Sequence, residues 1–192
     1  MNPMQGVGQS ATFSVPGVRR VIYYDIYDEE QYTGTSGTVK YYTSVAGKGA
    51  HQTNLNQPGM LPFREEFDCI AISVIPYFGT PVADLNLFYN GVALEFEINT
   101  KPVLKAPVCI FTTGCGLEGL SGFTGTAVAA GEAAQAHNGE ADPGKILTFP
   151  EPYHIGKGEQ FGLKLITDTA ITLSASFYCK VVMHGVIRSL VQ

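Results

Sequence analysis

The sequence contains no tryptophan and only 15 % charged residues, and both shortages bear on function. Charged residues make up roughly 25 % of an average soluble protein, so a surface this poor in charge is typical of one that other chains cover. Sugar-binding sandwiches usually present tryptophan rings to their ligands, although tyrosine and phenylalanine can replace them. The absence of tryptophan therefore disfavours a carbohydrate-binding module without excluding it.

Clusters of basic residues and of metal ligands are also missing. The formal charge is −5 and the only adjacent basic pair is Arg19-Arg20, so we expect no contact with nucleic acid except through that pair. The four histidines, at positions 51, 137, 154 and 184, include no H-x-H pair of the kind that cupin metal sites use.

Motifs of nucleotide binding and nucleophilic catalysis are incomplete. The segment GCGLEG (114–119) matches G-x-G-x-x-G, but the glycines that follow it do not propagate the helix that a nucleotide site requires. No G-x-S-x-G elbow is present. We therefore expect no catalytic, cofactor-binding or metal-binding residues, and we expect the protein not to be an enzyme.

No stretch approaches the roughly 18 consecutive apolar residues of a membrane span. The first residues lack the basic and apolar regions of a secretory signal, so we expect folding in a reducing cytoplasm. The four cysteines are then free thiols, with Cys69 and Cys179 buried in apolar strands. A bond between Cys109 and Cys115 stays an open alternative.

About eight short strands are predicted, because apolar runs alternate with turns formed by 22 glycines and 11 prolines. The segment FREEFDCIAISVIPYF (63–78) is typical of a strand covered on both faces. The segment LNLFYNGVALEFEINT (85–100) predicts two strands joined at Asn90-Gly91, since Asn-Gly is a strong hairpin signal. Glu95 and Glu97 should share one solvated face of the second strand.

The chain is predicted to form a flexible N-terminal arm (1–15) and a single domain (16–192). Within the domain, a long Gly/Ala-rich loop (about 114–145) contains AVAAGEAAQAH, which favours at most one short helix. The resulting fold class is all-β: a single jelly roll, or antiparallel β-sandwich, of about eight strands.

Five tyrosines gather in the first two predicted strands. A tyrosine ring packs while its hydroxyl stays in water, which suits a subunit interface and the edge of a core equally well. We therefore keep both interpretations. The candidate contacts between subunits are Tyr23, Tyr24, Tyr27, Tyr41, Tyr42, Arg188 and Gln192.

The last third of the chain resembles the C-terminal layout of phage virion proteins of the jelly-roll type. In that layout a P-x-x-I strand start precedes a G-[ED]-x-F strand, and the last strand ends with glycine, arginine and glutamine. Ser189 stands where the layout usually has proline. The match covers residues 54–192, with an entry strand at 54–74 and motifs at Pro152–Ile155, Gly158–Phe161, Gly185, Arg188 and Gln192.

The resemblance implies a capsid subunit that self-assembles into the icosahedral shell of a tailless phage. Its partners would be further copies and other virion proteins, its location the virion after assembly in the host cytoplasm, and it would need no cofactor. The apolar terminal strand would sit centrally in its sheet or be covered by a neighbouring subunit. A spike, penton or decoration subunit and a carbohydrate-binding β-sandwich are the alternatives.

Overall fold

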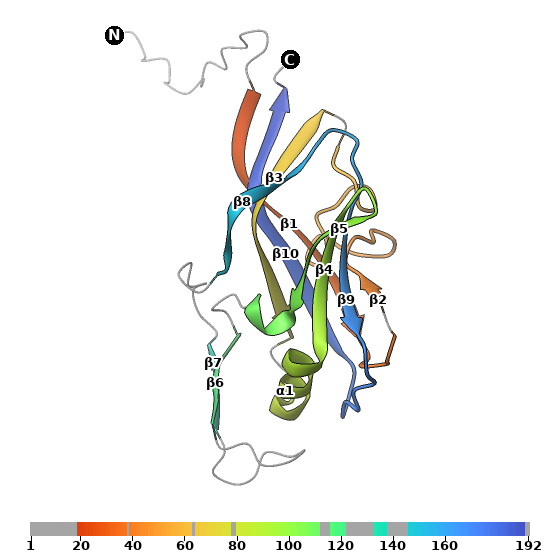
Figure 1. Ribbon diagram of the computed structural model, residues 1–192, viewed down its shortest axis with the longest axis vertical. Helices are drawn as coiled ribbons and strands as arrows, with labels where there is room; N and C mark the ends of the chain where they lie inside the picture. Colours follow the sequence, from red (N-terminus) through yellow and green to blue (C-terminus); the bar gives the residue numbers. More distant parts are fainter. Residues whose placement is uncertain are drawn as a thin grey trace, which may run out of the picture.

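The computed structural model describes residues 19–37, 39–62, 64–77, 80–111, 116–121, 133–137 and 146–190. Within these ranges, two four-stranded antiparallel sheets face each other across the core (Figure 1). In spatial order, sheet A contains β1 (Arg19–Tyr32), β10 (Phe177–Leu190), β3 (Glu65–Pro76) and β8 (Thr148–Ile155). Sheet B contains β2 (Val39–Tyr41), β9 (Phe161–Thr167), β4 (Val92–Ile98) and β5 (Lys101–Pro107).

The pairing of these eight strands is nested. Counted along the chain, the first pairs with the eighth, the second with the seventh, the third with the sixth and the fourth with the fifth. The chain thus forms one antiparallel ribbon, and the pairs β10–β3 and β9–β4 wrap that ribbon into two sheets. This is a jelly roll, so the predicted fold class is confirmed. The last strand, β10, lies centrally between β1 and β3.

The predicted hairpin at Asn90-Gly91 is wrong, because the preceding residues form the helix α1 (Val82–Gly91). Pro81 precedes the helix and its carbonyl accepts a hydrogen bond from the Leu85 N–H at 3.0 Å. Leu85 and Phe88, three positions apart, are both buried, which is the spacing of one helix face. The two-residue hairpin lies one strand later, at Asn99 and Thr100, where φ is 51° and 63°.

The long Gly/Ala-rich loop begins after the short helix η1 (Val108–Ile110). Its described parts are two strands, β6 (Gly116–Ser121) and β7 (Ala133–His137), which pair with each other. The short helix expected in this loop is therefore wrong over Ala133–His137, where pairing with β6 replaces a short helix that would be costly to nucleate. The predicted N-terminal arm (1–15) lies outside the described residues.

The core fills the space between the sheets with side chains that alternate along the strands. At the end near α1, the rings of Tyr32, Phe88 and Phe177 meet, with centroids 4.9 Å apart for Tyr32–Phe88 and 5.4 Å apart for Phe88–Phe177. The Tyr32 hydroxyl lies 2.7 Å from Thr167 Oγ1 in a buried hydrogen bond. This contact joins sheet A to sheet B inside the core.

A β-bulge interrupts the ladder between β10 and β3. His184 pairs with Ala71 and Gly185 pairs with Cys69, so the residue between these two β3 positions is extra. The two strands approach closely here: a Cβ atom on Gly185 would lie 2.2 Å from the Asp68 carbonyl oxygen. Only glycine fits this position. Gly185 is also one of the motif positions in the resemblance to phage virion proteins.

We expect Gly185→Ala to lower the free energy of unfolding by about 1–3 kcal/mol, because the added methyl group must displace backbone. Gly162→Ala is the matched control, since a Cβ there would meet Glu97 Oε2 at 3.4 Å, an ordinary contact. Urea unfolding of both variants checks the expectation. Equal stability of the two variants would contradict the close approach at Gly185.

The cysteines differ sharply in their surroundings. Burial raises the pKa of Cys69 and of Cys179 to about 12, whereas Cys109 is exposed. The expected burial of the two strand cysteines is confirmed. The alternative bond from Cys109 would need Cys115, which lies outside the described residues.

At pH 8, iodoacetamide should label Cys109 in the folded protein and leave Cys69 and Cys179 unmodified, because the thiolate is the reactive form. In urea all three should react. Peptide mapping by mass spectrometry distinguishes the sites, and rapid labelling of Cys179 in the folded protein would contradict the described core.

Candidate functional site

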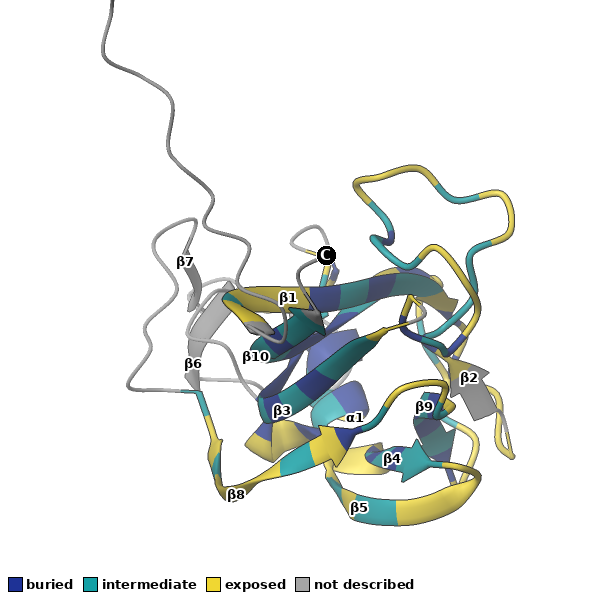
Figure 2. Ribbon diagram, turned by 90° about the horizontal axis from the view of Figure 1, so that it is seen from above, coloured by how far each residue is buried: buried dark blue, intermediate teal, exposed yellow. Residues whose placement is uncertain are grey.

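Sheet A extends beyond sheet B at one end, and this projecting end is the candidate site (Figure 1). We define it by residues 19–25 of β1, 184–190 of β10 and 65–69 of β3, which are hydrogen-bonded neighbours. Its exposed apolar side chains are Val21, 62 % exposed, Tyr23, 69 %, and Tyr24, 40 %. The first part of β1 is correspondingly coloured as exposed in Figure 2.

Strand β1 passes from an exposed environment into the core along its length. From residue 26 onward three of its four even-numbered residues, Ile26, Asp28 and Tyr32, are buried, which is the alternation of a strand with one covered face. Before Ile26 this alternation is lost, since Tyr23 and Tyr24 are both exposed although they point to opposite faces. At the projecting end, each face of β1 therefore carries an exposed tyrosine.

The outer face of sheet A carries a hydrogen-bonded chain at the base of the projecting end. His184 Nδ1 lies 3.0 Å from Asp25 Oδ1, and His184 Nε2 lies 2.8 Å from Ser73 Oγ. The three residues come from β1, β10 and β3. Asp25 lies directly opposite His184, whereas Ser73 lies diagonally across from His184, two residues beyond its β3 partner Ala71.

This chain has the order of a nucleophile, a base and an orienting carboxylate. Ser73, however, is 0 % exposed, so its hydroxyl is not accessible to a substrate in this structure. These hydrogen bonds hold β1, β10 and β3 against one another on the outer face of sheet A.

A second polar cluster lies on the same face, nearer the C-terminal end of β10. Arg188 forms an ion pair with Asp68, and the other oxygen of that carboxylate lies 2.7 Å from His154 Nδ1 on β8. The candidate contact Arg188 thus already has an intramolecular partner. Its side chain is 37 % exposed, so it stays accessible at the rim of the projecting end.

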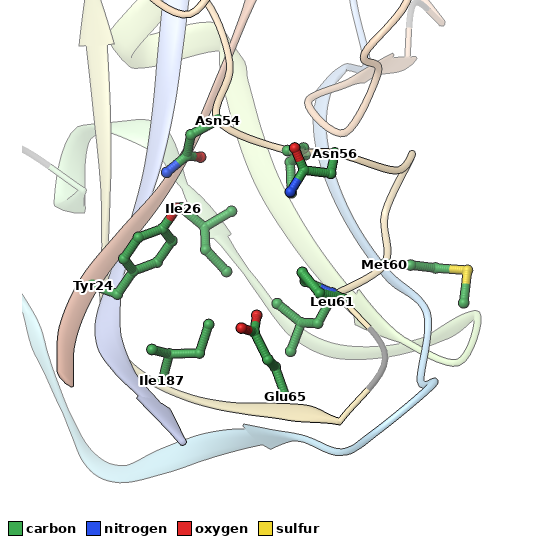
Figure 3. A pocket seen from close by; sticks show the side chains of 10 residues that line it. Tyr24, Ile26, Asn54, Asn56, Met60, Leu61, Glu65 and Ile187 are labelled. Carbon is green, nitrogen blue, oxygen red and sulfur yellow. The ribbon is translucent and has the colours of Figure 1, made fainter. Parts of the chain in front are cut away.

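The inner face of the projecting end is hollowed where it meets the loop after β2. The labelled side chains in Figure 3 show Tyr24, Ile26 and Ile187 from sheet A opposite Leu61 from the loop. Glu65 adds a carboxylate to this apolar lining, which also includes Asn54. The hollow is small, and its lining mixes apolar and polar side chains.

The same loop covers the free edge of β1 below the projecting end. Lys48 Nζ lies 2.8 Å from Oδ2 of the buried Asp28 and 2.7 Å from Glu30 Oε1. Burial raises the pKa of Asp28 and outweighs the lowering by Lys48. Asn54 then bonds the strand edge itself: its Oδ1 accepts from the Tyr27 N–H at 2.9 Å, and its Nδ2 donates to the Asp25 carbonyl at 2.6 Å.

The structure brings four of the predicted contact residues to sheet A, namely Tyr23, Tyr24, Tyr27 and Arg188. Tyr27 is half-buried, because its hydroxyl donates to the Ala50 carbonyl and Lys180 Nζ lies 5.3 Å from its ring centroid. Of the basic pair, Arg20 is exposed on the projecting end and Arg19 begins β1. Gln192 lies outside the described residues.

Tyr41 and Tyr42 do not belong to this site. Tyr42 is 1 % exposed and lies in the core, so we remove it from the candidate contacts as a correction. Tyr41 is exposed on sheet B, where Lys164 Nζ lies 5.4 Å from its ring centroid. Lys164 also contacts Glu95 and Glu97, which share one face as predicted but are ion-paired there instead of freely solvated.

Comparison with family models, curated proteins and solved structures finds no match. Among the described residues, no helix has the length and hydropathy needed to cross a membrane. In the same part of the chain, no group of three or more His, Cys, Asp or Glu side chains is placed to hold a metal ion.

We expect Asn54→Ala to lower the free energy of unfolding by about 1–2 kcal/mol, because it removes two hydrogen bonds from the edge of β1. Asn56→Ala is the control, since Asn56 is an exposed residue of the same loop. That variant should stay within about 0.5 kcal/mol of the unmodified protein in urea unfolding. A similar loss in both variants would show that Asn54 does not hold the edge.

Proposed function

We propose that this protein is a jelly-roll capsid subunit that self-assembles into the icosahedral shell of a tailless phage. The observation that carries the proposal is the projecting end of sheet A, which exposes Val21 and Tyr23 on its outer face and Tyr24 on its inner face. Jelly rolls serve as capsid subunits, lectins and cupins, so the fold is compatible with a shell without selecting it. The low charge content favours a surface covered by other copies.

Assembly would be driven by burial of these side chains between copies. Each square ångström of apolar surface removed from water contributes about 25 cal/mol, so several modest contacts per subunit stabilise a closed lattice. Tyrosine is enriched at the centre of protein interfaces, where its ring is buried and its hydroxyl finds a partner. Further copies and other virion proteins are the partners that this mechanism requires, and no cofactor takes part.

The proposal predicts discrete oligomers or shells in light scattering and negative-stain images of the purified protein. Tyr23→Ser should shift the population toward monomer by weakening association at least tenfold. Tyr77→Ser is the matched control, because Tyr77 is 63 % exposed but lies away from the projecting end. It should leave assembly unchanged.

The alternatives predict different results in the same experiment. Trimers that do not enlarge at any concentration would indicate a spike, penton or decoration subunit. A monomer that binds a glycan array would indicate the carbohydrate-binding sandwich and contradict self-assembly. Equal effects of the Tyr23 and Tyr77 variants would show that the projecting end is not the contact surface.

A further inference from the structure

The loop after β2 covers the free edge of β1 at Tyr27 and reaches it last at Asp25. The N–H and C=O groups of a strand residue point to the same side, and successive residues alternate. The Tyr27 N–H and C=O both bond loop residues at the outer edge, the carbonyl accepting from the Thr53 hydroxyl at 3.1 Å. Odd-numbered residues of β1 therefore direct their backbone groups away from β10.

N-terminal to Asp25, the loop no longer bonds the outer edge of β1. Val21 and Tyr23 direct their N–H and C=O groups outward, and none of the residues that the structure describes pairs with them. Natural sheet edges are usually protected by charged side chains, bulges or covering loops. The edge at 19–25 instead carries the two most exposed apolar residues of β1, Val21 and Tyr23.

We propose that β1 pairs antiparallel with β1 of a second copy across this edge, about a two-fold axis at Ile22. The open edge runs from Arg19 to the N–H of Asp25, because the Asp25 carbonyl already accepts a hydrogen bond from Asn54. The midpoint of this edge is Ile22, so the register extends along its whole length. Val21 then lies opposite Tyr23 of the second copy, and the two residues exchange both N–H···O bonds. The contact is isologous, as expected for a closed dimer.

The side chains are complementary in this register. On the outer face, exposed Val21 packs against exposed Tyr23 of the second copy. On the inner face, Arg20 lies opposite Tyr24, a pair suited to a cation–π contact. Ile22 lies opposite Ile22 of the second copy.

Other registers are less favourable. A shift of the pairing by one residue would set outward groups of one copy against inward groups of the other, which breaks the ladder. A two-fold axis at Val21 or at Tyr23 keeps the hydrogen-bond alternation, but it places Arg20 opposite an isoleucine, Ile22 or Ile26, in place of Tyr24. These residue pairs therefore favour a second copy of the chain as the partner of β1, with the two-fold axis at Ile22.

The paired strands would join two copies of sheet A into one continuous sheet. This inference rests on the proposed self-association at the projecting end and names its geometry. It does not require a closed shell, because a two-fold contact is complete within a dimer. Assembly and strand pairing can consequently be tested apart.

A symmetric disulfide tests the register directly. At the centre of the pairing, Ile22 forms a non-hydrogen-bonded pair with its own copy, for which Cα atoms lie about 4.5 Å apart. That separation is within disulfide range. We expect Ile22→Cys, in a background with Cys109→Ser and Cys115→Ser, to form cross-linked dimers under mild oxidation on a non-reducing gel.

Two further variants control for chance collisions. Arg20→Cys alone and Tyr24→Cys alone place the identical cysteines four residues apart, about 13 Å, which is beyond disulfide range. Neither should cross-link by itself, but a mixture of the two should give the mixed dimer, because position 20 lies opposite position 24. Equal cross-linking of all single variants would overturn the register.

Proline separates main-chain pairing from side-chain packing. Val21→Pro removes an outward N–H that sheet A does not use, so the monomer should keep its fold, as circular dichroism will show. Dimerisation should weaken at least tenfold, and more than in Val21→Ala, which keeps the N–H. Equal effects of proline and alanine would overturn strand pairing.

The two proposals fail in distinguishable ways. Oligomers or shells that form without the Ile22 cross-link would overturn the strand pairing and leave the capsid proposal standing. Cross-linked dimers that never enlarge would support the pairing and contradict the capsid proposal. A protein that stays monomeric and uncross-linked at all concentrations would overturn both.

Discussion

The antiparallel ladder between β1 and β10 is the constraint on which the structure depends. It runs without a break from Arg19 opposite Leu190 to Tyr32 opposite Phe177, and it joins the two ends of the described chain. Because β10 also pairs with β3, this ladder centres the last strand in sheet A. It sets Asp25 directly opposite His184, and it brings Tyr32 to the aromatic cluster at the other end of the sandwich.

Part of the β1–β10 ladder is covered by sheet B and part is exposed, because sheet A is longer than sheet B. Where sheet B faces it, even-numbered β1 side chains such as Ile26 and Tyr32 are buried, and burial of this kind stabilises the domain. Beyond sheet B the same backbone continues with Val21 and Tyr23 exposed and with an edge that the covering loop leaves at Asp25. The strand is held in shape by β10, so it can meet a partner without first being ordered.

Much of the fold was predictable from local patterns, whereas the arrangement of the site was not. Alternation and turn residues predicted the strands, but Asn90-Gly91 misled because Pro81 and the spacing of Leu85 and Phe88 favour a helix there. Tyr41 and Tyr42 are neighbours in sequence, and only packing decides which one is buried. The Asp25–His184–Ser73 chain escaped detection because strand pairing, which no local motif encodes, brings its members together.

The central claim is that copies of this sandwich complete one another at the projecting end. Amide hydrogen exchange over residues 20–25, followed by mass spectrometry as protein concentration is raised, tests it most directly. The account predicts that the amides of Val21 and Tyr23 become protected as copies associate, while those around Glu29, lower on the same edge, do not change. Exchange at Val21 and Tyr23 that stays fast in assembled protein would contradict it.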